Sequence, residues 1–293
     1  MTRHCKPSVL TMISEDEWQE LFPERWGVGQ KWKAEYEDKD FFHPKMEVDY
    51  YSYGNFISAM GRAKRLGVNN FLTEPGSAHE DNMRELAAFL AICSTQTNNG
   101  PDAFYYRECV EHERHQGDKN ICLYRDVRDR RDFVLCNTPS YYPEGCRLAG
   151  EKKFPVQSYH GRGPIMLRGA YYYGLFSEFV FGNPDKLLQN PDLLINDGEL
   201  GFLSAIWFWV TDKNGRPSCH RAMYRYLKHI HSWGFGHTII DVSDGMESNA
   251  MEGGTANHER LVSTRTQFYR KYATRFGVNI GIKGEQLDTV GLE

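Results

Sequence analysis

The sequence predicts a mainly α-helical protein with long loops and only short β pieces. Residues 79–96 and 197–211 repeat apolar side chains at intervals of three and four, which is the spacing of one buried helix face. Strand signals are few, and the run from Thr238 to Val242 is the best of them. Residues 101–157 have no sustained periodicity, so we expect long loops there.

The first two helices have clear boundary signals. Ser14 can cap a helix start while Glu17 completes a capping box. The helix over residues 79–96 ends at Gln96, directly before the turn-forming sequence Asn98–Gly100. A side chain in that place can leave the core and enter a cleft. The expected apolar face of this helix comprises Met83, Leu86, Ala87, Leu90 and Cys93.

Three more helices are expected towards the C-terminus. The helix over 197–211 ends at the Asn214–Gly215 turn, and the next one starts at Ser218, after a proline. The last covers about residues 259–276.

Composition bounds the function classes. The chain has 293 residues, 40% hydrophobic and 25% charged, which is typical of a globular protein with one large or two small domains. A formal charge of −4 gives no general reason to bind nucleic acid or an anionic membrane. No apolar run reaches the ~18 residues of a membrane span, and residues 1–10 lack the apolar core of a signal peptide. No phosphate-binding loop, dinucleotide turn or metal-ligand motif is present, so no cofactor and no metal is expected.

One stretch carries a family resemblance. Residues 158–174 read S-Y-H-G-R-G-P-I-M-L-R-G-A-Y-Y-Y-G. This resembles the sugar-cleft motif of the family 19 glycoside hydrolases, the plant-type chitinases, which reads roughly Y-Y-G-R-G-P-I-Q-L-S-x-N-Y-N-Y-G. Further motifs follow in the family's order: N-P-D-L at 190–193, A-I-W-F-W-V-T at 205–211, R-P-S-C-H at 216–220 and R-T-Q-F-Y-R-K-Y at 265–272.

The resemblance implies the fold and its organisation. It covers nearly the whole chain and implies a lysozyme-like, two-lobed α fold with a long cleft. We expect an N-terminal extension over residues 1–12, a single chitinase-like domain over 13–280 and a C-terminal tail over 281–293.

The catalytic positions implied by the resemblance are altered. Inverting hydrolysis of a glycoside needs an acid and a base carboxyl roughly 6.5–9.5 Å apart. The resemblance places the base at Glu113, with Glu108 and Glu111 close enough to replace it if the register shifts. The family reads S-H-E-T at the acid, whereas this chain has Thr95 and Gln96 in place of the His and Glu. An amide cannot give up a proton near neutral pH, so general-acid catalysis is expected to be lost.

Other positions that contact sugar or water in the family also differ. Arg168 replaces the serine that helps to hold the attacking water, and we hypothesise that it pairs with Glu113 and lowers the pKa of that base. The alternative is a solvent-facing Arg168. Met166 replaces a Gln, Tyr172 an Asn, and Ser243 the Asn before the family's G-G pair.

The remaining candidate site residues follow the family more closely. One tyrosine of 171–173 is expected to be a sugar platform, with Tyr171 favoured by the resemblance, although all three could be core aromatics. Glu247 and Arg265 match a pair that braces the family's acid, or they form a structural salt bridge. The resemblance also places Thr95, Thr97 and Tyr142 among the substrate-binding positions.

The seven cysteines leave two interpretations open. Cys109, Cys122, Cys136 and Cys146 cluster in a loop-rich stretch that bridges would help to order, or they are reduced thiols. The resemblance implies a Cys136–Cys146 bridge and a secreted protein. Cys219 is expected to be a buried free thiol.

Three functions remain in competition. In the first, a chitinase-like pseudoenzyme binds chitin or another polysaccharide without cutting it, or presents its altered cleft to a protein partner. In the second, an active endochitinase carries an engineered Glu→Gln change at Gln96 or uses another acid such as Glu108. The third is a structural scaffold without a ligand. One engineered change does not account for Thr95, Met166, Arg168, Tyr172 and Ser243, so the sequence favours the first.

Overall fold

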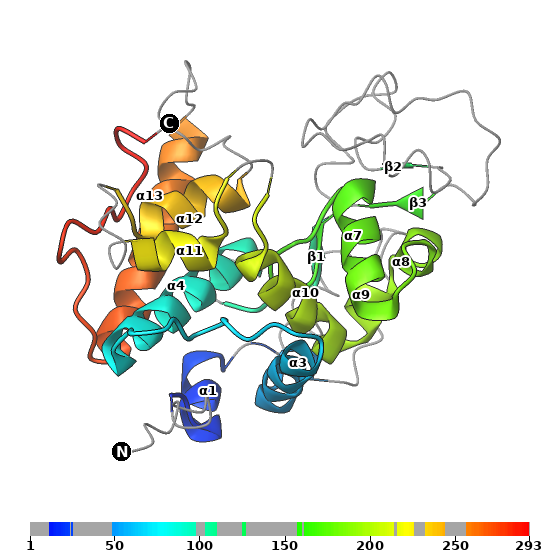
Figure 1. The fold of residues 1–293 in the computed structure, drawn as a ribbon, viewed down its shortest axis with the longest axis horizontal. Helices are drawn as coiled ribbons and strands as arrows, with labels where there is room; N and C mark the ends of the chain where they lie inside the picture. The colour runs from blue at the N-terminus through cyan, green and yellow to red at the C-terminus, as the bar shows by residue number, and fades with distance from the viewer. Residues whose placement is uncertain are drawn as a thin grey trace. The chain divides into compact units, whose positions relative to one another are not determined.

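The structure, a computed structural model, is mainly α-helical, as the sequence predicts (Figure 1). It describes residues 12–23, 25, 49–97, 103–109, 125–126, 157–159, 161–213, 216–225, 232–243 and 256–292. The strands in this part of the chain form two short antiparallel pairs. β1 (Glu108–Cys109) pairs with β4 (Gly161–Arg162), and β2 (Arg125–Asp126) pairs with β3 (Gln157–Ser158).

Contacts divide the chain into two compact units. Unit 1 comprises residues 1–23, 68–95 and 209–293, and unit 2 comprises residues 24–67 and 96–208. One boundary between the units falls inside a helix, directly before Gln96. The boundaries that the sequence suggests for an extension, a domain and a tail stay predictions.

In the described residues, unit 1 contains most of α4 (His79–Thr97) together with four other helices. The expected Ser14–Glu17 capping box is confirmed at the start of the first of them, and Ser218 caps α11 as predicted. Residues 81–95 of α4 are all buried, not only the predicted apolar face. It is therefore a central helix, surrounded by other elements. The other helices of unit 1 are α1 (Glu15–Leu21), α11 (Cys219–Tyr224), α12 (Phe235–Val242) and α13 (Ala256–Arg275).

The predicted strand at Thr238–Val242 is wrong, because these residues form the second half of α12. All five are buried, so packing against neighbouring helices overrides the β propensity of this β-branched run. Gly236 permits a close approach at the start of the helix, because a Cβ there would lie 1.8 Å from the carbonyl oxygen of Asp288. The Gly236 amide donates to the Gln286 carbonyl at 2.8 Å, so the segment after α13 packs on α12.

Unit 2 is built around an aromatic cluster. Tyr51 lies against Phe104 and Phe202 with ring centroids 4.9 and 5.8 Å apart, and Phe56 contacts the same Phe202 ring at 5.4 Å. The neighbouring Tyr50 donates its hydroxyl hydrogen to the Leu194 carbonyl. Where the structure describes this unit, its helices are α3 (Tyr53–Arg65), α7 (Ala170–Phe181), α8 (Asp185–Gln189), α9 (Leu193–Asn196) and α10 (Gly198–Val210) as far as residue 208.

A glycine inside α10 makes the Tyr50 contact possible. A Cβ on Gly201 would lie 1.9 Å from the Tyr50 hydroxyl oxygen and 2.7 Å from its Cζ. We expect Gly201→Ala to cost about 1–3 kcal/mol of unfolding free energy, because the buried ring must shift. Gly54→Ala in α3 is the matched control, since its Cβ would meet nothing closer than 3.9 Å. The control should stabilise the protein by about 0.5–1 kcal/mol, and urea midpoints that move in the same direction for both variants would contradict this account.

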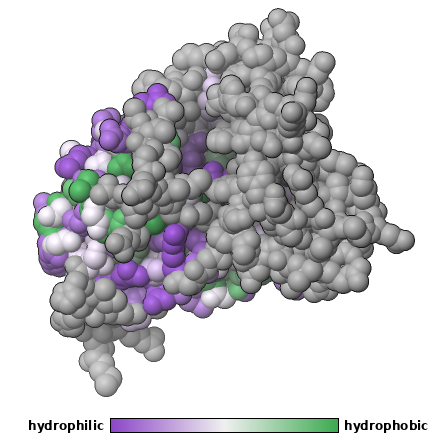
Figure 2. All heavy atoms as spheres, turned by 90° about the horizontal axis from the view of Figure 1, so that it is seen from above, coloured by the Kyte–Doolittle hydropathy of each residue, from purple (hydrophilic) through white to green (hydrophobic). Residues whose placement is uncertain are grey.

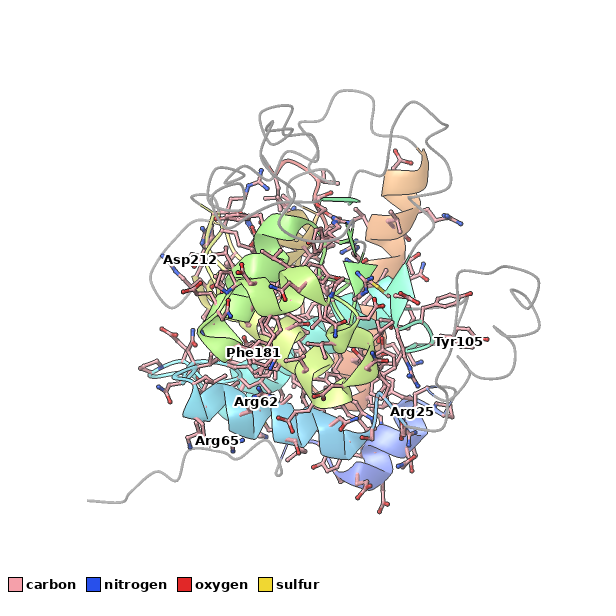
Figure 3. The ribbon with its side chains drawn as sticks, turned by 90° about the vertical axis from the view of Figure 1, so that its right-hand side faces the viewer. Arg25, Arg62, Arg65, Tyr105, Phe181 and Asp212 are labelled. Carbon is pink, nitrogen blue, oxygen red and sulfur yellow. The ribbon has the colours of Figure 1, made fainter. Side chains whose placement is uncertain are left out.

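The described surface carries few exposed large apolar side chains, namely Leu66 and Val290. On the face shown in Figure 2, hydrophilic and apolar residues are intermixed where colour is given. In unit 2, the Arg62 guanidinium lies 6.0 Å from the centre of the Phe181 ring (Figure 3), and the Lys186 ammonium lies 4.8 Å from it. These cations cover the ring while remaining accessible to water. Among the described helices, none combines the length and apolar character that a membrane crossing requires.

Candidate functional site

The end of α4 holds the position at which the family's acid is expected. Ser94 shares a buried hydrogen bond of 2.6 Å with the Tyr272 hydroxyl, and Thr95 donates its hydroxyl hydrogen to the Ala91 carbonyl at 2.7 Å. Thr97 accepts from the Phe104 amide at 2.9 Å. Of residues 94–97, only Gln96 is partly exposed. The helix therefore carries a partly exposed carboxamide residue at this point. The residues directly before and after it are held by hydrogen bonds.

Thr97 also anchors the chain that follows. Its carbonyl oxygen accepts from the amides of Tyr105 and Tyr106 at 2.9 and 2.8 Å, and its side chain is fully buried. Phe104 adopts a φ of 57°, in the left-handed region, where this turn closes. The contacts of Thr97 are thus structural, and its suggested role in sugar binding stays a prediction.

The loop that carries the sugar-cleft motif is tightly folded. Its backbone closes on itself through Arg162, whose amide donates to Leu167 at 3.1 Å and whose carbonyl accepts from Leu167 at 2.9 Å. Met166 stands at the tip with a φ of 52°, a strained conformation for a residue that is not glycine. A Cβ on Gly161 would lie 2.9 Å from the Met166 Cβ, so this glycine permits the fold of the loop.

Arg162 is the buried cation beneath this loop. Its guanidinium donates to the Tyr173 hydroxyl at 3.0 Å and to Asp192 at 2.7 Å. Burial alone lowers the pKa of Arg162, but Tyr173 and Asp192 outweigh it and the pKa is raised, so the cation is permanent. Sequence reasoning missed this role, although an arginine between two glycines in an otherwise apolar motif is a signal that it must be paired.

The three consecutive tyrosines have different surroundings. Tyr173 is fully buried with its hydroxyl on Arg162, and Tyr172 is buried with its ring 5.5 Å from Phe208. Tyr171 is partly exposed, and partial burial raises the pKa of its hydroxyl. Tyr171 is thus the tyrosine of the three with ring surface left to offer a ligand. Arg168, two positions after Met166, is also half-buried.

Two other predicted site residues, Ser243 and Arg265, lie in unit 1. Ser243 ends α12 and donates its hydroxyl hydrogen to the Ile240 carbonyl at 3.2 Å. Arg265 is buried on α13. Near Ser243, burial raises the pKa of Asp241 to about 7 even though the charges of Lys213, Arg216 and Arg225 oppose that shift.

Several predicted positions lie outside the described residues. They include the base position Glu113, with Glu111, Tyr142, Glu247 and the Cys136–Cys146 pair. Glu108 lies in β1, opposite Arg162 of β4. Cys219 is a buried free thiol, as predicted, and so is Cys93. Within the described ranges, no three His, Cys, Asp or Glu side chains gather as metal ligands would.

Comparison with known proteins identifies the family. The family model for class I chitinases, glycoside hydrolase family 19, matches residues 44–289. Chitinase 10 of Oryza sativa subsp. japonica is 30% identical over 243 residues, covering 79% of this chain and 71% of that protein. Endochitinase 3 of Solanum tuberosum is 31% identical over 244 residues, covering 80% of this chain and 64% of that protein. The chain thus spans about two thirds of the length of these relatives.

Solved structures share the fold at lower identity. Chitinase C from Streptomyces griseus HUT6037 matches with a TM-score of 0.58 at 22% identity, covering 94% of this chain and 80% of that one. The class IV chitinase from Zea mays matches with a TM-score of 0.55 at 22% identity, covering 94% and 98%. The predicted lysozyme-like chitinase fold is confirmed, and the chain belongs to glycoside hydrolase family 19.

Proposed function

We propose that this protein binds chitin, or oligomers of β-1,4-linked N-acetylglucosamine, and does not hydrolyse them. The observation that carries the proposal is the partly exposed Gln96 at the end of α4, in the place of the family's acid. A carboxamide donates and accepts hydrogen bonds, so it can contact a sugar. It cannot protonate a leaving oxygen, which the reaction requires.

Two further replacements support the loss of catalysis. Thr95 stands where the family has a histidine, and its hydroxyl hydrogen is used within α4 by the Ala91 carbonyl. Arg168 stands where the family has the water-holding serine, and a guanidinium is bulky and always charged. The acid and the water-holding serine are therefore both replaced. Pairing of Arg168 with Glu113 would also weaken the remaining group, which is the base.

The retained features support binding. The chain matches the family model over residues 44–289, and its relatives are named chitinases or endochitinases. Tyr171 is partly exposed on α7, and Tyr173 of the same helix accepts a hydrogen bond from Arg162. Chitin is an extracellular polymer, so the proposal includes secretion. No cofactor enters the proposal.

Calorimetric titration with an N-acetylglucosamine hexamer tests the binding half of the proposal. We expect saturable binding by the unmodified protein. Tyr171→Ala should weaken it about fivefold, equal to about 1 kcal/mol, because the aromatic platform is lost. Phe181→Ala is the matched control, since it lies ten residues further along α7, about 15 Å away. It should bind as the unmodified protein does.

Absence of heat in the titration, together with failure to retain the protein on chitin beads, would contradict the proposal. That result would favour the protein-partner or scaffold interpretation of the cleft. Cleavage of the hexamer during the titration would favour an active endochitinase that uses another acid.

A further inference from the structure

We propose that His220 is held as a doubly protonated imidazolium between Glu85 and Glu74, and that this charged clamp positions α4. The proposal goes beyond the proposed function, because it concerns the interior of unit 1 and holds whether or not the protein binds a sugar. Three separate segments meet in the clamp: α4 through Glu85, α11 through His220 and the segment before α4 through Glu74.

The geometry requires two imidazole hydrogens. His220 Nδ1 lies 2.8 Å from Oε1 of Glu85, and Nε2 lies 3.2 Å from Oε2 of Glu74. The histidine is 1% exposed and the Glu85 side chain is fully buried. A neutral imidazole has a single N–H, so it would turn a lone pair towards one of these carboxylates. An imidazolium satisfies both.

The rest of the cluster shows that Glu85 is the acceptor. Its Oε1 also accepts from the Trp209 indole, which can only donate, at 2.8 Å. Its Oε2 lies 3.0 Å from the Tyr224 hydroxyl. Three donors therefore surround a carboxylate that is shielded from water.

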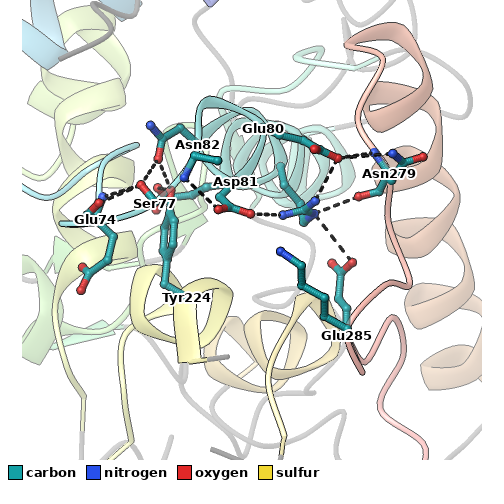
Figure 4. A network of polar contacts seen from close by, with 12 residues as sticks. Glu74, Ser77, Glu80, Asp81, Asn82, Tyr224, Asn279 and Glu285 are labelled. Atoms are coloured by element: carbon teal, nitrogen blue, oxygen red, sulfur yellow. Dashed lines mark hydrogen bonds and ion pairs between the residues drawn. The ribbon is translucent and has the colours of Figure 1, made fainter. Parts of the chain in front are cut away.

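The hydroxyl groups of Ser77 and Tyr224 both contact the side chain of Asn82 (Figure 4). The Tyr224 hydroxyl lies 2.9 Å from Oδ1 of Asn82, and the Ser77 hydroxyl lies 2.8 Å from the same atom. Ser77 also lies 2.7 Å from the Glu74 carbonyl. Because each hydroxyl has one hydrogen, we assign the Asn82 amide the flipped orientation, in which its nitrogen donates to both hydroxyls and each hydroxyl donates to its other partner. Tyr224 then donates to Glu85.

The charge balance agrees with this assignment. Burial by itself lowers the pKa of His220, but Glu85 and Glu74 outweigh it and raise that pKa above its ordinary value. Tyr224 also lies against the His220 ring, with ring centroids 4.9 Å apart. A raised histidine pKa means that the stability contribution is fully present below about pH 6.5 and is lost as the pH rises through the folded-state pKa.

The clamp acts on the helix that carries Gln96. Glu85 and Gln96 are eleven residues apart on α4, about 16 Å along its axis. His220 is therefore a positioning residue, because loss of one proton from the imidazolium removes the hydrogen from one of its two contacts, either the one to Glu85 of α4 or the one to Glu74.

Nitrogen-15 NMR of the intact protein tests the protonation state directly. We expect both His220 ring nitrogens to carry hydrogen at pH 6.5 and to titrate together at a higher pH. His237 is the internal comparison, because burial and then Arg225 lower its pKa to about 4, so it stays neutral across this range. A singly protonated His220 at pH 6 would overturn the proposal.

Two variants separate the clamp from simple packing. Glu74→Gln keeps an acceptor but removes a charge, and it should move the His220 titration to lower pH. His220→Gln should remove the fall in unfolding midpoint that we expect of the unmodified protein as the pH rises above about 6.5. An unchanged His220 titration in Glu74→Gln contradicts the clamp, and this readout remains decisive if His220→Gln does not fold.

Discussion

Gln96→Glu alone will not produce an efficient chitinase. The restored carboxyl would stand beside Thr95, whose hydroxyl is committed to the Ala91 carbonyl, and Arg168 would still occupy the place of the water-holding serine. Both groups must change before the acid and the activated water can act together. We expect the single variant to release few or no products from an N-acetylglucosamine hexamer, as measured by mass spectrometry.

The combined variant Thr95→His, Gln96→Glu, Arg168→Ser should raise hydrolysis by ~10²–10⁴-fold over the unmodified protein, which is the range that general-acid catalysis contributes. Adding Glu113→Gln to it provides the control and should abolish the gain, because the base position is then an amide. Robust turnover by Gln96→Glu alone would show that the other replacements are neutral and would refute the multi-site account.

Glu85→Leu should cause the largest loss of stability of any change discussed. It leaves the buried His220, the Trp209 indole N–H and the Tyr224 hydroxyl without their acceptor. Removing one partner of a buried charge pair typically costs about 3–5 kcal/mol. Guanidinium unfolding monitored by tryptophan fluorescence measures this cost.

The matched control for that variant is Glu80→Gln, one turn earlier in α4. Its side chain is 45% exposed and pairs with Arg84 at 3.3 Å, so solvent screens the interaction. We expect a loss below about 1 kcal/mol. Equal losses in the two variants would mean that the buried cluster contributes no more than a surface ion pair.

Local sequence patterns predicted the helix ends that carry capping or turn-forming residues. The Ser14 and Ser218 caps and the end of α4 beside Gln96 follow from short-range rules. The strand predicted at Thr238–Val242 failed because full burial, rather than local propensity, decides that segment. Helix α4 could not be recognised as central, since a charged pair such as Arg84 and Glu85 normally marks a solvated face.

The candidate site was predictable in position but not in its contacts. The family motifs identify Gln96, Met166 and Tyr171 as site positions. The hydrogen bonds of Thr95 with Ala91 and of Thr97 with Phe104 become known only from the folded structure. The pairing of Glu85 with His220 joins residues 135 positions apart. The periodicity of a single sequence does not predict a contact between residues so far apart in the chain.

Prolonged incubation of the unmodified protein with the N-acetylglucosamine hexamer tests the central claim most directly. Mass spectrometry of the mixture should show the hexamer intact. On ultrafiltration of the same sample, the oligomer should be retained together with the protein. Accumulation of shorter oligomers at a rate that scales with protein concentration would contradict the account, because it would show that the protein still supplies a proton to the leaving oxygen.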